Sequence, residues 1–133
     1  MKFSSKSRYA LRVMVDLAEN DGVQSVKAIS MRQDISEKYL EQIFSLLVKA
    51  GLVESFRGAQ GGYQLAKQTD KIFVGEILRA AEGSLYVIDC LDPNMPCNIE
   101  SKCKTHTYWN NLNNLVNNYL DTVSLKDIIT NNK

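Results

Sequence analysis

Four potential metal ligands lie close together in the sequence: Cys90, Cys97, Cys103 and His106, separated by six, five and two residues. Soft thiolates combined with one imidazole suit zinc or an iron–sulfur cluster far better than magnesium or calcium. The spacing lacks the Cys-x-x-Cys pairs that are usual in structural zinc sites, and it would let an irregular loop wrap around a larger group. The residues alone leave three interpretations open: an iron–sulfur cluster, a zinc ion, or side chains that bind no metal.

A second group of polar side chains has the chemistry needed to contact base pairs. Apolar residues between positions 36 and 50 recur with the spacing of one helix face, which leaves the other face polar. The outward positions of this predicted helix are Lys38, Tyr39, Glu41, Gln42 and Ser45. Glutamine can bind adenine through two hydrogen bonds, and glutamate can accept from the cytosine amine. Lysine can bind phosphate or guanine, and tyrosine can bind phosphate or contact a thymine methyl. The alternative is an ordinary solvated helix face.

Basic residues and glycines extend this possible nucleic-acid surface. Four basic residues precede the first acidic residue of the chain: Lys2, Lys6, Arg8 and Arg12. Further along, Arg57 and Gly58 open a glycine-rich loop. Glycines let a loop lie close to a DNA backbone, and arginine is attracted into a narrow minor groove. We therefore add Arg8, Arg57 and Gly58 to the candidate DNA contacts.

The elements that would position these side chains form a winged helix-turn-helix. Capping residues and helical periodicity predict helices over about residues 5–20, 25–32, 36–50 and 74–81. A change to a period of two predicts strands at 52–56 and 62–66 around the loop 57–61. Two helices joined by a short turn and followed by a two-stranded hairpin form a motif whose second helix enters the major groove. The expected fold class is mainly α with a small β-hairpin wing.

A long helix is predicted after the cysteine-rich segment, from about residue 105 to residue 120. Its apolar stripe consists of Trp109, Leu112, Val116 and Tyr119, and asparagines fill the opposite face. We interpret the stripe as the seam of a homodimer; the alternative is packing on the chain's own winged domain. The chain then divides into a DNA-binding domain (1–83), a cysteine-rich loop (84–104) and a dimerisation helix with a C-terminal turn (105–133).

Length and composition limit the remaining possibilities. The chain has 133 residues, a formal net charge of +1 and an odd number of cysteines, three. No apolar run reaches the roughly 18 residues that span a bilayer, and the start lacks the apolar core of a signal peptide. We therefore expect the cytoplasm, where thiols stay reduced, and no membrane partner. The sequence shows no nucleophile–base arrangement, and its single histidine is already a ligand candidate, so we do not expect an enzyme.

Four segments closely resemble the Rrf-type winged-helix regulators: SKSRYAL (5–11), YLEQ (39–42), GLV (51–53) and RGAQGGY (57–63). The order Cys…Cys…Cys-x-x-His also resembles the 2Fe–2S site of the iron–sulfur cluster regulators in that family. The resemblance implies a homodimeric repressor of iron–sulfur cluster assembly genes, which contacts a pseudo-palindromic DNA operator through Tyr39, Glu41, Gln42 and Arg57. It also implies that the three cysteines and the histidine hold a 2Fe–2S cluster.

The sequence departs from this family pattern in two places. Lys38 stands where such regulators often have a small hydroxyl residue, which points to a different operator preference, and the gap between Cys90 and Cys97 is one residue longer. Related nitric-oxide sensors hold a 4Fe–4S cluster with an acidic residue near the N-terminus, where this chain has Arg8. The cysteine-metabolism repressors of the group lack the cysteine trio. The alternatives are a regulator that responds to nitric oxide or thiol oxidation, and a small electron-transfer protein. The predicted wing argues against the second, because an electron carrier needs no element that contacts DNA.

Overall fold

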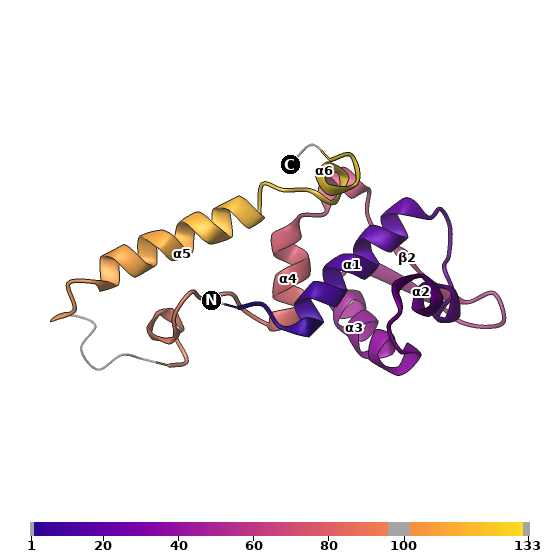
Figure 1. Cartoon of the computed structure of the whole chain (residues 1–133), viewed down its shortest axis with the longest axis horizontal. Helices are drawn as coiled ribbons and strands as arrows, with labels where there is room; N and C mark the ends of the chain where they lie inside the picture. The colour runs from indigo at the N-terminus through magenta and orange to yellow at the C-terminus, as the bar shows by residue number, and fades with distance from the viewer. Residues whose placement is uncertain (1, 96–101, 132–133) are drawn as a thin grey trace.

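The computed structural model describes residues 2–95 and 102–131, and most of these residues lie in helices (Figure 1). In chain order the elements are α1 (Ser5–Glu19), α2 (Val26–Gln33), α3 (Glu37–Lys49), β1 (Val53–Phe56), β2 (Gly62–Leu65), η1 (Thr69–Lys71), α4 (Val74–Glu82), η2 (Asp89–Leu91), α5 (His106–Leu120) and α6 (Leu125–Ile129). The two strands pair antiparallel, with Val53 opposite Leu65 and Phe56 opposite Gly62. The predicted fold class, mainly α with a β-hairpin wing, is confirmed.

Serine side chains fix the start of several helices. The hydroxyls of Ser4, Ser25 and Ser36 accept hydrogen bonds from backbone N–H groups in the first turns of α1, α2 and α3. Such caps satisfy amide groups that have no partner inside the helix. Between α2 and α3 the chain turns at Asp34, whose φ of 55° is left-handed. Because Asp tolerates this conformation better than most residues, the two helices of the motif can follow each other closely.

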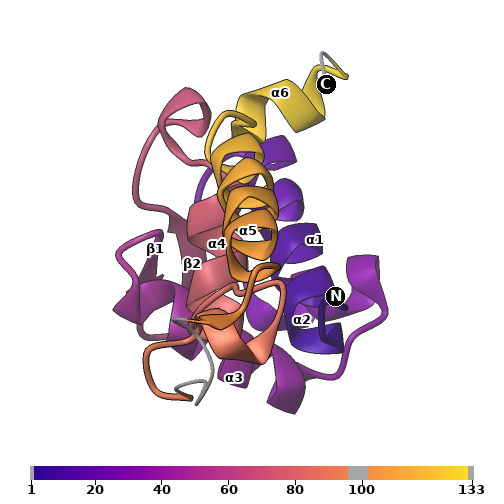
Figure 2. The same ribbon diagram turned by 90° about the vertical axis from the view of Figure 1, so that its left-hand side faces the viewer.

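The hydrophobic core lies between α1, α2, α3 and α4, and it fixes which face of α3 points outward. Its largest fully buried side chains include Met14, Ile29, Leu40, Phe44 and Ile77. Burial of such a side chain contributes about 1.5–3 kcal/mol to folding. Since one face of α3 is held in this way, its polar face is exposed. Figure 2 shows α3 at the lower edge of the domain.

A buried carboxylate ties α1 to α2. Asp16 is 2% exposed, and its oxygens accept hydrogen bonds from Arg32 at 2.7 and 2.9 Å and from Gln33 at 2.9 Å. Burial would raise the pKa of Asp16, but the hydrogen bonds from Arg32 and Gln33, together with the charge of Arg32, hold this pKa below its ordinary value. The ionised form of Asp16 therefore stabilises the fold.

We expect Arg32→Ala to lower the free energy of unfolding at pH 7 by about 2 kcal/mol, because it removes charge-assisted hydrogen bonds to a buried carboxylate. Since the folded-state pKa of Asp16 lies below its unfolded value of about 3.9, this contribution is present above that pH and is lost as the pH falls through the folded-state pKa. Urea unfolding between pH 7 and pH 3 measures it. Lys67→Ala, which breaks the exposed Lys67–Glu76 pair at 3.2 Å, is the control. A loss for Arg32→Ala that does not shrink with falling pH contradicts the prediction.

The long helix α5 extends away from the winged domain, and α6 returns to pack on α1 (Figures 1 and 2). None of the residues of α5 is buried. The sequence places the asparagines of α5 on a face opposite the apolar stripe. Two of them, Asn113 and Asn117, form hydrogen bonds with the backbone of Val87 and Leu85, in the segment that follows α4. No helix in the described parts of the chain is long and apolar enough to cross a membrane.

Candidate functional site

The polar face of α3 gathers most of the predicted DNA contacts on one exposed surface. Lys38, Glu41, Gln42 and Ser45 are all exposed. They line a hollow of about 520 Å³ together with Leu46 and, from α1, Lys6. Because Ser36 caps the helix, these residues lie in its first turns, which lead into the major groove in helix-turn-helix proteins. The arrangement presents hydrogen-bond donors and acceptors beside the ammonium groups of Lys6 and Lys38.

Tyr39 connects this surface to the start of α1. Its ring packs edge-on against Tyr9, with ring centroids 5.6 Å apart. The residue is half-buried and lines a neighbouring hollow of about 400 Å³ with Ser4, Ser5, Lys6, Ala81 and Glu82. The position of Tyr39 therefore favours contact with a phosphate at the edge of the surface over contact with a base in its middle.

Glu82, which the sequence analysis did not select, holds the start of α1 in place. Its carboxylate accepts hydrogen bonds from the backbone N–H of Ser4 and from the hydroxyls of Ser4 and Ser7. These hydroxyls hold the pKa of Glu82 below its ordinary value, against the effect of burial, with a smaller contribution from the charge of Lys6. Because Lys6 lies between Ser4 and Ser7 in the chain, these hydrogen bonds of Glu82 also help to hold Lys6 beside α3.

The wing is anchored to α3 through an aromatic pair. Tyr63 of β2 stacks on Phe44 with ring centroids 4.1 Å apart and an interplanar angle of 10°. Burial and, to a smaller extent, the negative charge of Glu41 raise the pKa of Tyr63. The stacked pair thus couples the wing to α3 by packing.

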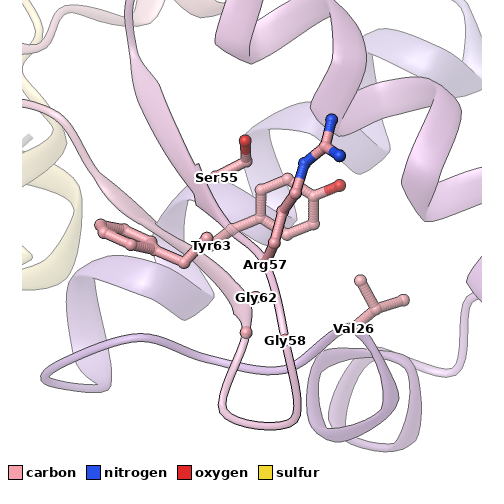
Figure 3. A pocket seen from close by; sticks show the side chains of 8 residues that line it. Val26, Ser55, Arg57, Gly58, Gly62 and Tyr63 are labelled. Carbon is pink, nitrogen blue, oxygen red and sulfur yellow. The ribbon is translucent and has the colours of Figure 1, made fainter.

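Gly62 lets the wing approach the turn before α2. The backbones of Tyr63 and Gln24 exchange hydrogen bonds of 2.8 and 2.9 Å, and a Cβ at Gly62 would lie 2.1 Å from the carbonyl oxygen of Gln24. Figure 3 shows the resulting hollow, with Arg57 and Tyr63 extending from the hairpin away from its turn and Val26 of α2 opposite them. Arg57 and Gly58 are exposed, as a role in DNA binding requires.

Arg8 lies apart from the recognition surface, which is the exposed polar face of α3 (Lys38, Glu41, Gln42 and Ser45). Its guanidinium donates to Ser5 Oγ at 3.2 Å. It lines a different hollow, of about 570 Å³, with Tyr9, Leu11, Arg12, Val15, Glu19, Gln33 and Ile128. Of the basic residues in α1, Lys6 is the one that lines the same hollow as the polar face of α3. A DNA contact by Arg8 stays a prediction, and the position of Lys6 makes it the stronger candidate.

The described members of the predicted ligand set lie on both sides of a segment that the structure does not describe. Cys90 lies in η2, Cys103 lies three residues before α5, and His106 is the first residue of α5; all three are half-buried. Cys97 lies outside the described residues. Among the described residues, no three histidine, cysteine or acidic side chains come together as a metal-ligand set.

The chemistry of the donors nevertheless fits a soft metal or an iron–sulfur cluster. The Sγ of Cys103 lies 3.1 Å from the hydroxyl of Thr105. This hydroxyl and the backbone N–H of Thr105 hold the pKa of the Cys103 thiol below its ordinary value. The thiolate is the form that binds metals, so the contact with Thr105 favours the form of Cys103 that a metal site would require. The neighbouring imidazole of His106 adds a donor that iron–sulfur and zinc sites both accept.

The outer face of α5 carries more exposed apolar surface than the sequence analysis assigned to it. Tyr108, Leu115 and Tyr119 are 61%, 69% and 60% exposed. Tyr119 was predicted to lie on the apolar stripe, and the helical spacing of Tyr108, Leu115 and Tyr119 adds the first two to it. Predicted stripe residues Trp109, Leu112 and Val116 are half-buried. The stripe therefore has one edge against the chain's own domain and one edge in solvent.

The sequence matches the Rrf2 family, described as iron-dependent transcriptional regulators, over residues 3–131. The HTH-type transcriptional regulator IscR of Aliivibrio salmonicida is 41% identical over 135 residues, which cover 100% of this chain and 80% of that protein. Among solved structures, T. potens IscR aligns with a TM-score of 0.78 and 38% identity, covering 100% of this chain and 89% of that one.

The structure of CymR, the global cysteine regulator of B. subtilis, aligns with a TM-score of 0.78 and 37% identity, covering 98% of this chain and 97% of that one. These matches extend over the winged helix-turn-helix, the cysteine-rich segment and α5 together. They confirm the family resemblance that the sequence motifs indicated. The chain belongs to the Rrf2 family of iron-dependent transcriptional regulators.

Proposed function

We propose that this protein represses iron–sulfur cluster assembly genes by binding a pseudo-palindromic DNA operator as a homodimer, according to the state of an iron–sulfur cluster. One observation carries the proposal. His106, a predicted ligand, is the first residue of the helix whose other end is bonded to α4 of the winged domain. A change at the ligand segment would therefore be transmitted through α5 to α4, which packs against α1 and α3. The similarity to IscR supports the choice of regulated genes.

In this proposal residues 1–83 bind DNA. Lys38, Glu41, Gln42 and Ser45 face the major groove, with Lys6 beside them and Tyr39 at their edge against a phosphate. Arg57 and Gly58 approach the minor groove, and Arg8 lies closer to the flanking backbone. Gln42 and Glu41 would supply specificity through base edges, and the basic side chains would supply affinity through phosphates.

Residues 84–104 together with His106 would hold the cluster, and α5, the helix of the segment 105–133, would form the dimer, while the C-terminal α6 packs on α1. Cys90, Cys97, Cys103 and His106 are the proposed ligands of a 2Fe–2S cluster; a 4Fe–4S cluster or zinc are the alternatives. When bound, such a cluster supplies a centre whose occupancy and oxidation state depend on iron and oxidants. Thr105 favours the thiolate of Cys103, and α5 carries the ligand segment at its N-terminus.

The DNA-binding half is tested by comparing Gln42→Ala with Lys38→Ala. We expect Gln42→Ala to relax specificity at one position in each half-site of the operator, at a cost of about 1–3 kcal/mol per half-site for the preferred base. Lys38→Ala is expected to weaken binding to all sequences alike and to lower the slope of log K against log salt by about 0.9 for each protomer, which is about 1.8 for the dimer. Fluorescence anisotropy with operator variants at several salt concentrations measures both effects.

Gln68→Ala, a neutral change at an exposed position before η1, is the matched control and should leave both quantities unchanged. If Gln42→Ala lowered affinity equally for every base, Gln42 would not be a specificity residue. If Gln42→Ala, Lys38→Ala and the control all bound like the wild type, α3 would not be the recognition helix.

A second candidate function is a thiol-responsive regulator. The half-buried Cys103 thiol has a lowered pKa, and low-pKa, accessible thiolates are the ones that oxidants attack first. The similarity to CymR, a cysteine regulator, also supports this alternative. A protein that binds no iron but changes its operator affinity reversibly on thiol oxidation would favour it.

A further inference from the structure

A polar cluster joins the C-terminal end of α5 to α4. The guanidinium of Arg79 donates to both carboxylate oxygens of Asp121, at 2.7 and 3.0 Å, and to Asn117 Oδ1 at 3.0 Å. Such a planar, two-pronged pair restricts orientation as well as distance, which a single ion pair does not. Arg79 therefore holds two residues, four positions apart, on one side of the end of α5.

The same face of α5 also holds the segment that follows α4. Asn117 Nδ2 donates to the carbonyl of Leu85 at 3.2 Å, and Asn113 Oδ1 accepts from the backbone N–H of Val87 at 2.9 Å. Since α5 has no buried residue, these polar contacts do much to set its direction.

Gly75 makes this close approach possible. A Cβ at Gly75 would lie 2.1 Å from Asp121 Oδ1 and 2.8 Å from Arg79 Nη1. Gly75 is the second residue of α4, and its φ does not lie in the left-handed region, so the backbone conformation does not require a glycine there. The glycine at this buried position is therefore explained by the space that the ion pair requires.

Helix α4, to which the end of α5 is bonded, also supports α3, the proposed recognition helix. α4 packs against both α1 and α3, and Glu82 at its end fixes the start of α1. The direction in which α5 leaves α4 is therefore also its direction relative to α3. In a dimer joined through α5, that angle sets how far apart the two recognition helices lie and how they are turned.

We infer that Arg79, with Asn117 and Asp121, is a positioning element that fixes the angle between α5 and the DNA-binding domain and thereby the half-site spacing that the dimer accepts. This inference rests on the proposed function, since it requires a dimer that binds two half-sites. Arg79 itself lies outside the proposed DNA contacts. Its effect is on which operators fit, and only secondarily on how tightly DNA is held.

The test measures affinity for operators whose half-sites are moved closer or further apart by two base pairs, which turns one half-site by about a fifth of a helical turn. We expect the wild type to prefer its best spacing by roughly tenfold or more, because the DNA must otherwise be deformed. Arg79→Ala and Gly75→Ala should each reduce this preference to within about threefold. Arg79→Lys, which keeps the charge but loses the two-pronged geometry, should fall between these values.

Lys67→Ala is the control, because it breaks the ion pair between Lys67 and Glu76 of α4, which does not involve α5. It should keep the wild-type preference. The inference is overturned if Arg79→Ala and Gly75→Ala remain dimeric and keep the wild-type spacing preference, or if they lose affinity equally at every spacing. If the wild type is a monomer or shows no operator binding, the proposed function itself fails.

Discussion

Replacing Leu115 and Tyr119 by glutamate is expected to convert the protein to a monomer and to weaken operator binding by about 10²- to 10⁴-fold. Both side chains are more than half exposed on α5, and two carboxylates in an apolar seam would have to be desolvated without partners. A dimer binds its second half-site as an intramolecular step, and the monomer loses that advantage. Sedimentation equilibrium and operator titration of the double variant measure the two effects.

The matched control places the same charges on the other side of the helix. Asn110 and Asn114 are exposed and lie on the face of α5 away from Leu115 and Tyr119, so Asn110→Glu with Asn114→Glu should remain dimeric and bind DNA normally. If both double variants stayed dimeric, α5 would not be the seam. If both became monomers, charge on α5 and not its apolar stripe would be responsible.

Cys103→Ala is expected to lower the iron content of anaerobically purified protein at least tenfold, since even the loss of an outer-shell partner costs ten- to hundredfold in metal affinity. We also expect its operator affinity or sequence preference to differ from that of the iron-loaded protein by about tenfold, which is typical for a shift between two binding states. Iron analysis and parallel titrations with two operator sequences measure these effects.

Thr107→Ala is the matched control, because Thr107 is neutral, exposed and next to His106, but carries none of the proposed ligand atoms. It should keep its iron and its operator preference. If Cys103→Ala lost its iron but bound every operator like the wild type, the cluster would have a role other than sensing. If it kept its iron, Cys103 would not be a ligand.

The helices and the hairpin could be predicted because their signals are local. Serine caps such as Ser25 and Ser36 and the apolar spacing of Leu40 and Phe44 depend on residues only a few positions apart. The family motifs added the function, because YLEQ and RGAQGGY cover the recognition helix and the wing together. The three-residue helices η1 and η2 were not predicted, since such short turns have no periodicity.

The contacts that position the site could not be predicted, because they join residues that are distant in sequence. Arg79 meets Asp121 across 42 positions, and Ser4 meets Glu82 across 78. No spacing rule selects such partners before the chain is folded. For the same reason the sequence could not show that Lys6 lines the same hollow as the polar face of α3, because which side of α1 faces α3 depends on packing against α4.

The most direct test of cluster sensing is the composition of protein purified without oxygen. We predict a coloured protein with about two iron and two sulfide per chain, as a 2Fe–2S cluster requires, and little zinc. Its operator preference should change when the iron is removed by a chelator. A colourless protein that contains zinc or no metal, and that selects the same operator before and after chelation, would contradict the proposed sensing function.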